Sequence, residues 1–303
     1  MLDATRLRVL VAVAQHGSVT AAARELRYAQ PSVSHHLSRL EAETGSQLIQ
    51  RVGRGIRLTE AGRVLAERAA EILGRMDAAE AELAAYSGLR AGRVRLAAFP
   101  SALGTFVPTA AAAFAAANPG VELSLTEAEP PDAVALLRSG AIDVALLFAH
   151  ENLGTAPRRD VDDDGLRRMS LLTEPIYLVT PADRPGDTLL DHSGSRWIAG
   201  CERCRTALVR SCEAVGFTPD IAFTTDDYLA VQALVAAGLG VTTLPELSLR
   251  SHRHPGVRVS RLAGPMRAVT AAVHGEPPDP PATAALLRDL ASATAAWAPS
   301  RPL

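Results

Sequence analysis

The stretch "GSVTAAARELRYAQPSVSHHLSRLEAETGSQLIQRVGRGIRLTEAG", residues 17–62, decides the fold of the N-terminal part of this chain. Apolar side chains just before it recur at helical spacing, namely at Leu7, Leu10, Val11 and Ala14. Gly17 can end that first helix, and Ser18 can cap a second, short helix over "VTAAARELR". After the turn "YAQ", Pro31 can take the first position of a third helix. The pattern thus predicts three consecutive helices.

The third helix has two chemically different faces. Val33, Leu37 and Leu40 share one face, which predicts packing against a core. The opposite face carries small polar groups, a histidine and an arginine, at Pro31, Ser32, His35, Ser38 and Arg39. Such a face can enter a DNA major groove and hydrogen-bond base edges and phosphates. A helix face that is merely solvated has the same pattern, so this alternative stays open at this point.

The segment "QRVGRGIRLT" predicts a β-hairpin after the third helix. Val52, Ile56 and Leu58 are spaced as on the inner face of a hairpin, and the glycines on either side of Arg54 place that arginine at the turn. An arginine at such a tip suits the narrow minor groove and its negative potential. Three helices followed by this wing predict a winged helix-turn-helix.

Charge is distributed unevenly along the chain. Residues 1–58 carry eight arginines against four acidic residues, a net charge of +4, whereas the whole chain of 303 residues has a net charge of −2. This asymmetry favours a nucleic-acid-binding module at residues 1–58, and the overall charge argues against a protein that coats nucleic acid along its whole length. The chain has no lysine, so all 31 basic residues are arginine.

Residues 17–62 resemble the N-terminal domain of the LysR-type transcriptional regulators. The shared residues are Ser18, Ala21, Ala22, Leu26, Gln30, Pro31, Ser34, Leu40, Glu41, Gly45, Leu48, Arg51 and the closing Leu58-Thr59-Glu60-Ala61-Gly62. The chain departs from the family at His35, where arginine is frequent, and at Ile49, where phenylalanine is common. With the polar face of the third helix, the resemblance implies contacts to double-stranded DNA from Ser18, Gln30, Pro31, Ser32, Ser34, His35, Ser38, Arg39, Arg51 and Arg54.

A long helix is expected from Thr59 to Tyr86, within a linker that spans residues 59–89. Its apolar residues are spaced 4-3-4-3-4-3, a heptad seam, at Leu65, Ala69, Ile72, Met76, Ala79, Leu83 and Tyr86. A rod of roughly 42 Å with one narrow apolar stripe needs something to pack against, either a second chain or its own domain. The resemblance implies a linker helix that pairs two chains. Dimerisation is then expected at Leu65, Ile72, Met76 and Leu83.

The family's usual assembly is a dimer of dimers. A two-fold dimer would present two DNA-binding domains to an inverted-repeat promoter site.

From residue 90 onward, apolar strand-like runs alternate with helical segments. This rhythm predicts an α/β fold with a buried parallel sheet and a cleft at the carboxyl ends of the strands. The stretches "SGAIDVALLF" (139–148) and "LVAAGLGVTTLP" (234–245) resemble the family's effector domain, which is similar to periplasmic binding proteins. The resemblance implies an effector-binding domain at 90–303, with one subdomain at about 91–162 and 267–300 and a second at about 163–266.

Strand-to-helix turns offer free backbone N–H groups to a polar or anionic ligand. The expected effector-binding residues are Ser101, Thr126, Glu129, Phe148, Cys201 and Thr225. In the family, a small hydroxyl residue at the place of Ser101 commonly contacts the effector. Phe148 suits a pocket wall and a core equally well.

All three cysteines lie in "GCERCRTALVRSC", residues 200–212. Helical spacing places Cys204 and Cys212 on one face with Leu208 and Val215, which predicts packing. A disulfide between them would have to span about 12 Å of helix, which is too far. Cys201 and Cys204 could close a local bond. A thiol-based redox-sensing regulator of the same family, using Cys201 with Cys204 or Cys212, therefore remains an alternative to small-molecule sensing.

Other functional classes find little support in the sequence. There is no G-x-S-x-G, H-E-x-x-H or phosphate-loop motif, so no enzyme is expected. The acid-rich stretch 158–168 lacks the alternating ligands of a calcium loop and is expected to be solvated, and no metal or cofactor is expected. No apolar run of eighteen residues and no signal-peptide layout is present, so we expect a cytoplasmic protein without a membrane partner. The predicted winged helix-turn-helix at residues 1–58 argues against a free-standing solute receptor.

Overall fold

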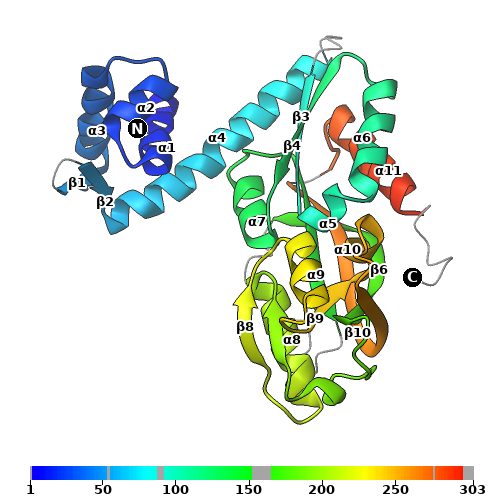
Figure 1. Cartoon of the computed structure of the whole chain (residues 1–303). Coiled ribbons are helices and arrows are strands. Elements are labelled where there is room, and N and C mark those ends of the chain that lie inside the picture. Colours follow the sequence, from blue (N-terminus) through cyan, green and yellow to red (C-terminus); the bar gives the residue numbers. More distant parts are fainter. Residues whose placement is uncertain (1, 53–54, 87–91, 152–164, 276, 296–303) are drawn as a thin grey trace. The chain divides into compact units, whose positions relative to one another are not determined.

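The computed structural model describes residues 2–52, 55–86, 92–151, 165–275 and 277–295. Contacts divide the chain into two units (Figure 1), one of residues 1–92 with 134–143 and one of residues 93–133 with 144–303. The wing tip with Arg54 and most of the acid-rich stretch lie outside the described residues. Among the described residues, no helix has the length and apolar character needed to cross a membrane.

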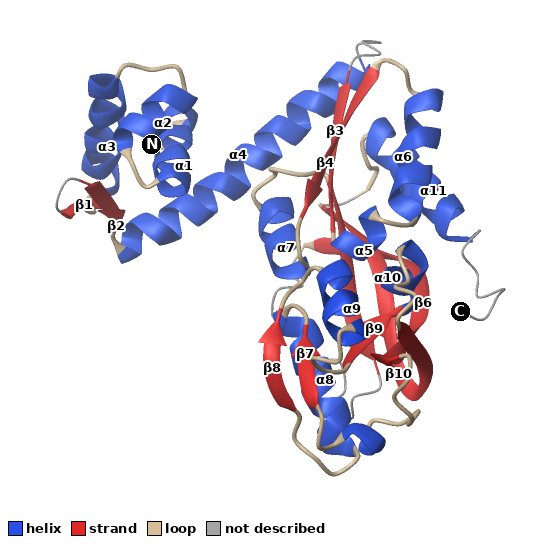
Figure 2. Ribbon diagram, viewed as in Figure 1, coloured by secondary structure: helices blue, strands red, loops and turns tan. Residues whose placement is uncertain are grey.

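The N-terminal unit contains the predicted helices and hairpin (Figure 2). In chain order these are α1 (Ala4–His16), α2 (Val19–Glu25), α3 (Gln30–Thr44), β1 (Ile49–Val52), β2 (Gly55–Leu58) and α4 (Glu60–Tyr86). The strands β1 and β2 pair antiparallel, as the hairpin prediction requires. The winged helix-turn-helix and the long helix after it are therefore confirmed.

Local caps explain where the first helices begin and end. Gly17 adopts the left-handed conformation (φ 60°) that ends α1, and the Ser18 hydroxyl accepts a hydrogen bond from the Ala21 N–H at the start of α2. The third helix starts one residue earlier than predicted, because Ala29 is its N-cap. Pro31 is therefore the second helical residue and not the first, a place where its missing N–H is still harmless.

The winged helix-turn-helix at residues 1–58, called the head below, has its own core. Val33, Leu37 and Leu40 are buried in this core as predicted. Ile56 and Leu58 pack against this core from the wing, whereas the side chain of Val52 lies outside the described residues. The first helix contributes Leu7, Val9, Leu10, Ala12 and Val13. The predicted stripe was wrong at Ala14, which is exposed near the end of α1.

The resemblance residues at the end of the head hold the wing against α3 and α4. The Glu41 carboxylate accepts the Leu48 N–H at 2.8 Å. The Thr59 hydroxyl donates to the Gln47 carbonyl at 2.7 Å and accepts the Gly62 N–H at 3.0 Å, so it caps α4. A Cβ atom on Gly62 would lie 2.0 Å from the Leu48 carbonyl oxygen, so only glycine fits there.

From residue 92 onward, helices and strands alternate as predicted. They are β3 (Gly92–Ala98), α5 (Pro100–Leu103), α6 (Phe106–Ala117), β4 (Val121–Glu127), α7 (Pro130–Arg138), β5 (Val144–Glu151), β6 (Leu166–Pro181), the 3-10 helix η1 (Leu190–His192), β7 (Arg196–Ala199), α8 (Glu202–Ala214), β8 (Asp220–Thr224), α9 (Tyr228–Ala236), β9 (Thr242–Pro245), α10 (Glu246–Ser251), β10 (Val257–His274) and α11 (Pro281–Ala295).

The main sheet is mixed, which corrects the prediction of a parallel one. Its strand order is β4-β3-β5-β10-β6-β9, and a separate pair is formed by β7 and β8. The pairs β3–β5 and β7–β8 are parallel, but β10 runs antiparallel to both β5 and β6, and β9 runs antiparallel to β6. The long strands β6 and β10 were missed at full length, because β10 contains Gly264-Pro265 and an irregular register between Arg261 and Met266.

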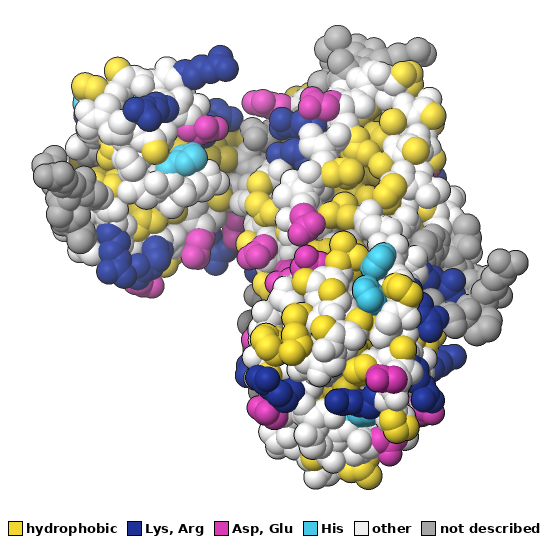
Figure 3. All heavy atoms as spheres, in the orientation of Figure 1, with side chains coloured by type: hydrophobic (Ala, Val, Ile, Leu, Met, Phe, Trp, Pro, Cys, Tyr) yellow, Lys and Arg dark blue, Asp and Glu magenta, His cyan; other side chains and the backbone are white. Residues whose placement is uncertain are grey.

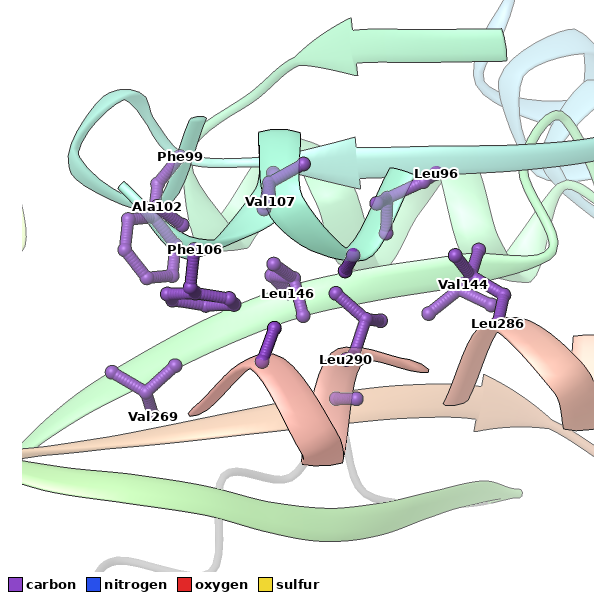
Figure 4. Packing of buried hydrophobic residues seen from close by; sticks show 14 of the residues in the cluster. Leu96, Phe99, Ala102, Phe106, Val107, Val144, Leu146, Val269, Leu286 and Leu290 are labelled. Carbon is purple, nitrogen blue, oxygen red and sulfur yellow. The ribbon is translucent and has the colours of Figure 1, made fainter. Parts of the chain in front are cut away.

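The part of the chain from residue 92 onward, called the body below, has a core made of separate clusters of buried side chains. In the largest, α6 and α11 pack on β3 and β5, and Figure 4 shows Phe106 and Leu290 near Leu146, and Leu286 beside Val144. Another cluster surrounds Trp197 on β7, and a further one lies between α9 and the strands β6 and β9. The large apolar content of the sequence is therefore divided among several cores.

Candidate functional site

The predicted DNA-reading face of α3 is exposed. Gln30, Pro31, Ser32, His35, Ser38 and Arg39 are all exposed, and Ser34 is half-buried. The Arg39 side chain keeps 64% of its surface accessible, and its Nε lies 4.0 Å from the Glu43 carboxylate. That carboxylate is also paired with Arg6, so Arg39 is held only loosely and is able to reach another partner.

The remaining predicted DNA contacts fall into two groups. The Ser18 side chain is half-buried and caps α2, which leaves one oxygen lone pair for a phosphate contact. The side chain of Arg51, and Arg54 altogether, lie outside the described residues. The face of the head visible in Figure 3 mixes basic, acidic and apolar side chains. A DNA contact must therefore rest on the geometry of α3 and the wing more than on a uniformly basic surface.

The predicted heptad seam of α4 is only partly available to a second chain. Ala69 is fully buried in the head core, and Leu65 packs against the same core. Ile72, Met76 and Leu83 remain exposed at 42%, 40% and 67% of their surface. The first residues of the seam therefore pack in the head core, and from Ile72 onward the seam exposes apolar side chains.

A pocket enclosing about 530 Å³, part of it open to solvent, lies in the body. It is built where β3, β7 and β8 end, since the residues that follow these strands line it. Five of the six predicted effector-binding residues are among its walls, namely Ser101, Glu129, Phe148, Cys201 and Thr225. Thr126 is not among the lining residues, because its side chain is exposed on β4.

The lining includes many residues that the sequence did not suggest. They are Phe99, Pro100, Gly200, Cys204, Asp226, Tyr228, Val231, Thr242, Thr243, Leu244, Pro245, Ser248 and Arg267. Most of them follow a predicted strand or lie on one, so the cleft prediction could have indicated them as a group. Arg267 had no such signal, because its strand was not recognised.

Arg267 is the most constrained polar residue of the pocket. It is 2% exposed on β10 and donates from Nε to the Glu174 carboxylate at 2.7 Å and from Nη2 to the Ser101 hydroxyl at 2.9 Å. The Glu174 carboxylate also accepts the Leu247 N–H at 2.6 Å. Ser101 thus serves as a buried hydrogen-bond partner at the pocket wall, in addition to any contact with a ligand.

Two aromatic rings complete this environment. The Arg267 guanidinium lies 5.0 Å from the centroid of the Phe99 ring and 4.7 Å from that of Phe148, and the two rings meet edge to face at 5.0 Å. Cations are attracted to ring faces at such distances. Phe148 therefore fills both roles that its position allowed: it is 4% exposed in the core, and it walls the pocket.

Burial shifts the protonation of several groups near the pocket. It raises the pKa of Glu174, while the Arg267 guanidinium and the Leu247 N–H act against this rise. Burial also raises the pKa of Glu129, and a hydrogen bond with Cys201 partly offsets the effect. It lowers the pKa of His150 to about 3, helped by the nearby positive charges of Arg267 and other arginines. His150 is therefore neutral at physiological pH.

The cysteines differ from one another in their surroundings. Cys212 is fully buried in the cluster around Trp197, as predicted. Cys204 also packs as predicted, but against the largest cluster and not the one around Trp197; it lines the pocket as well, and its sulfur lies 3.2 Å from that of Cys201. The turn of α8 carries Cys204 toward the other core, while Val215, beyond the last turn of that helix, is 44% exposed.

Among the described residues, no group of three or more histidine, cysteine or carboxylate side chains is arranged to hold a metal ion. The pocket instead combines aromatic walls, hydroxyl groups, carboxyl groups and a neutralised arginine. Such a mixture can hold a small organic molecule by hydrogen bonds and apolar contact.

Comparison with known proteins agrees with this geometry. The family model described as "LysR substrate binding domain" matches residues 87–295, and the one described as "Bacterial regulatory helix-turn-helix protein, lysR family" matches residues 4–63. The transcriptional dual regulator GltC of Bacillus subtilis (strain 168) is 30% identical over 253 residues, 81% of this chain and 81% of its own. The uncharacterized HTH-type transcriptional regulator YcgK of the same organism is 29% identical over 282 residues, 84% of this chain and 83% of its own.

A solved structure extends the likeness over both units. It is the full-length regulator CbnR complexed with its target DNA, which is 25% identical, with a TM-score of 0.64, and the match covers 96% of this chain and 100% of that one. The family models together span the winged head and the pocket-bearing body. The chain therefore belongs to the LysR family, whose members are DNA-binding transcriptional regulators with an effector-binding domain and are not enzymes.

Proposed function

We propose that this chain reads an inverted-repeat promoter site with α3 and the wing of two heads. The observation that carries the proposal is the exposed row of hydrogen-bonding groups on α3, on the face opposite its buried leucines. Side chains of this kind read base edges in a major groove. CbnR, a similar regulator whose structure was solved with its target DNA, supports DNA as the partner of this chain. Because DNA is the ligand, we place the protein in the cytoplasm.

Self-association would follow from the exposed apolar residues of α4. Ile72, Met76 and Leu83 offer a second helix a stripe at heptad spacing, whereas the fourth predicted residue, Leu65, packs against the head core. Two-fold pairing through α4 would join two heads, and a dimer of dimers would then bind two such sites. In this proposal, residues 1–58 form the DNA-binding domain and 59–89 the linker. Residues 90–303 form the effector domain, with subdomains at about 91–162 with 267–300 and 163–266.

The pocket would bind a small-molecule effector. Arg267 is already neutralised by Glu174, and Glu129 and Asp226 add carboxyl groups, so the walls do not form a net positive site. An effector with hydrogen-bonding groups and an apolar part fits these walls better than a bare anion. Its binding would regulate transcription only if it favours one arrangement of the assembly over another.

Selection of random DNA by the full-length protein tests the reading head. We expect an enriched inverted repeat, and we expect His35→Ala to alter the preferred bases more than the overall affinity. Because His35 and Ser46 are both exposed in the head, Ser46→Ala, off the reading face, serves as the matched control. If the protein enriches no sequence, or if His35→Ala and wild type select identical sites, reading by α3 is refuted.

A thermal-shift screen of metabolites on the full-length protein tests the pocket. A true effector should raise the melting temperature of the wild type, and Thr225→Ala should weaken that shift because Thr225 lines the pocket. Thr126→Ala is the matched control, since Thr126 is exposed on β4 and off the pocket. A ligand whose shift survives every pocket substitution binds elsewhere and contradicts the proposal.

A further inference from the structure

The turn between β7 and α8 holds two cysteines in contact. The sulfur atoms of Cys201 and Cys204 lie 3.2 Å apart, and both residues are partly exposed and line the pocket. Cys212, the third cysteine, is fully buried in a different cluster. We propose that Cys201 and Cys204 form a dithiol site that exchanges with small disulfides and closes to a Cys201–Cys204 disulfide in the pocket wall.

The backbone of this turn already suits the bond. Cys201 is the N-cap of α8, with an extended conformation (φ −54°, ψ 165°), and Cys204 lies in the first helical turn. A disulfide requires a sulfur–sulfur distance of about 2.05 Å, so the two sulfurs must approach by only about 1 Å. Side-chain rotation can supply this movement while α8 remains intact. By contrast, Cys204 and Cys212 lie two turns apart on α8 and cannot meet without unwinding it.

The surroundings favour Cys201 as the attacking sulfur. It stands at the start of α8, where the helix dipole and the backbone N–H of Cys204 favour a negative charge on its sulfur. The hydrogen-bonding contact between the two sulfurs lowers the pKa of the Cys201 thiol, and the same contact together with burial raises the pKa of Cys204. Burial raises the pKa of Cys212 to about 12, which makes that thiol unreactive.

Neighbouring charges modulate this pair without replacing it. The Glu129 carboxyl group is hydrogen-bonded to Cys201 and its charge opposes ionisation, while Arg267 favours the thiolate of Cys204. One oxygen of Glu129 is buried and has no protein partner. This carboxyl group, whose own pKa is raised by burial, is placed to exchange a proton with the Cys201 thiol.

The reaction needs no oxidant other than the small disulfide. The Cys201 thiolate attacks one sulfur of the disulfide, forms a mixed disulfide and releases one small thiolate. Cys204 gives up its proton and attacks the Cys201 sulfur, which forms the intramolecular bond and releases the second small thiolate. Two protein thiols are thereby oxidised, and one small disulfide is reduced to two thiols.

Closure of the bond would change the effector pocket, because both sulfurs belong to its wall. If oxidation alters affinity for an effector or for DNA, those ligands must in turn alter the ease of oxidation by the same factor. This consequence rests on the proposed effector function, whereas the thiol chemistry itself does not.

Alkylation mass spectrometry on the full-length protein tests the exchange. Reduced protein is incubated with oxidised glutathione, quenched with acid and labelled with N-ethylmaleimide. We expect Cys201 and Cys204 to lose their labels together, and Cys204→Ser to stop at a glutathione adduct on Cys201. Cys212→Ser is the matched control and should behave as the wild type. Full labelling of both cysteines in excess oxidised glutathione overturns the proposal, even where hydrogen peroxide closes the bond.

A second measurement separates the chemistry from its consequence. Oxidised and reduced proteins are compared in gel shifts on the DNA selected by the wild type, with Cys201→Ser as the form that cannot close the bond. We expect the affinity for DNA to differ between the two wild-type states and not between the treated and untreated variant. A disulfide that forms without any change in DNA affinity overturns the coupling, and absence of DNA binding in both states overturns the proposed function.

Discussion

At the scale of single residues, the pocket is organised around a buried ion pair. Glu174 and Arg267 are 3% and 2% exposed, come from the long strands β6 and β10, and share hydrogen bonds with Ser101 and with the N–H of Leu247. Each side chain neutralises the charge of the other, which would otherwise be buried without a counter-charge. The pair therefore fixes the wall of the pocket more than it adds to stability.

Removing one partner exposes this dependence. Glu174→Gln should destabilise the body by about 3–5 kcal/mol, because Arg267 keeps its charge without a counter-charge. Urea unfolding of the full-length protein, followed by circular dichroism, measures the change. Asp187→Asn is the control, because Asp187 and its partner Arg258 are 59% and 41% exposed and an exposed pair contributes about 0–1 kcal/mol. Equal losses in the two variants would contradict this account of the buried pair.

His150 gives the body a pH dependence. Its folded pKa is lowered to about 3, whereas an unfolded histidine titrates near 6.5, so the unfolded state binds the extra proton as the pH falls below about 6.5. The stability that neutral His150 preserves is complete above pH 6.5 and is lost toward pH 3. Between pH 7.5 and 5.5, wild type should lose about 1 kcal/mol more unfolding free energy than His150→Phe. If the urea midpoints of the two proteins fall equally between pH 7.5 and 5.5, the pKa of His150 is not lowered on folding.

The residues around the pocket show how far the candidate site could be predicted from the sequence. Ser101, Glu129 and Cys201 could be placed at the pocket, because each follows a recognisable strand. Arg267 could not, since its partner Glu174 is 93 positions away and the pairing is settled only when β6 and β10 meet. The Cys201–Cys204 contact likewise depends on where α8 begins, and the apolar spacing of Cys204, Leu208 and Cys212 does not show that it begins at Glu202.

At the scale of elements, the family resemblance marks the junction between wing and long helix. The residues that carry it at 58–62 are those that cap α4 and let it approach the Leu48 backbone just before β1. Helices with regular spacing and clear caps were recognised for the same local reasons. The long antiparallel strands were not, because strand pairing is a non-local interaction and β10 is interrupted by glycine and proline.

The close approach at Gly62 can be tested directly. A methyl group there would lie 2.0 Å from the Leu48 carbonyl oxygen, so Gly62→Ala must push α4 away from the backbone before β1. We expect a loss of at least about 1–3 kcal/mol in head stability, with weaker DNA binding. Gly194→Ala is the control, because nothing lies within 4 Å of the added carbon and its φ is not positive. Unchanged melting and DNA affinity in Gly62→Ala would mean that this contact is not tight in solution.

At the scale of the whole molecule, the proposed reading of an inverted repeat depends on joining copies of the chain. One head offers one reading helix, so an inverted repeat needs two heads with two-fold symmetry. The apolar residues of α4 that the head core leaves uncovered are the natural place for this pairing, since a rod with an exposed stripe buries it by meeting another. The sequence predicted this stripe but could not show which of its residues the head itself would occupy.

The double variant Ile72→Glu/Met76→Glu tests that role. Two charges in an apolar helix pair should convert the assembly to single chains at micromolar concentration, which sedimentation velocity measures. The same variant should bind an inverted repeat at least tenfold more weakly than the wild type but bind a single half-site equally well, because α3 is untouched. Arg75→Glu, on an exposed position of the same helix, adds charge without removing apolar surface and should leave the assembly intact. If the double variant sediments as the wild type does, the chains pair through a surface other than α4.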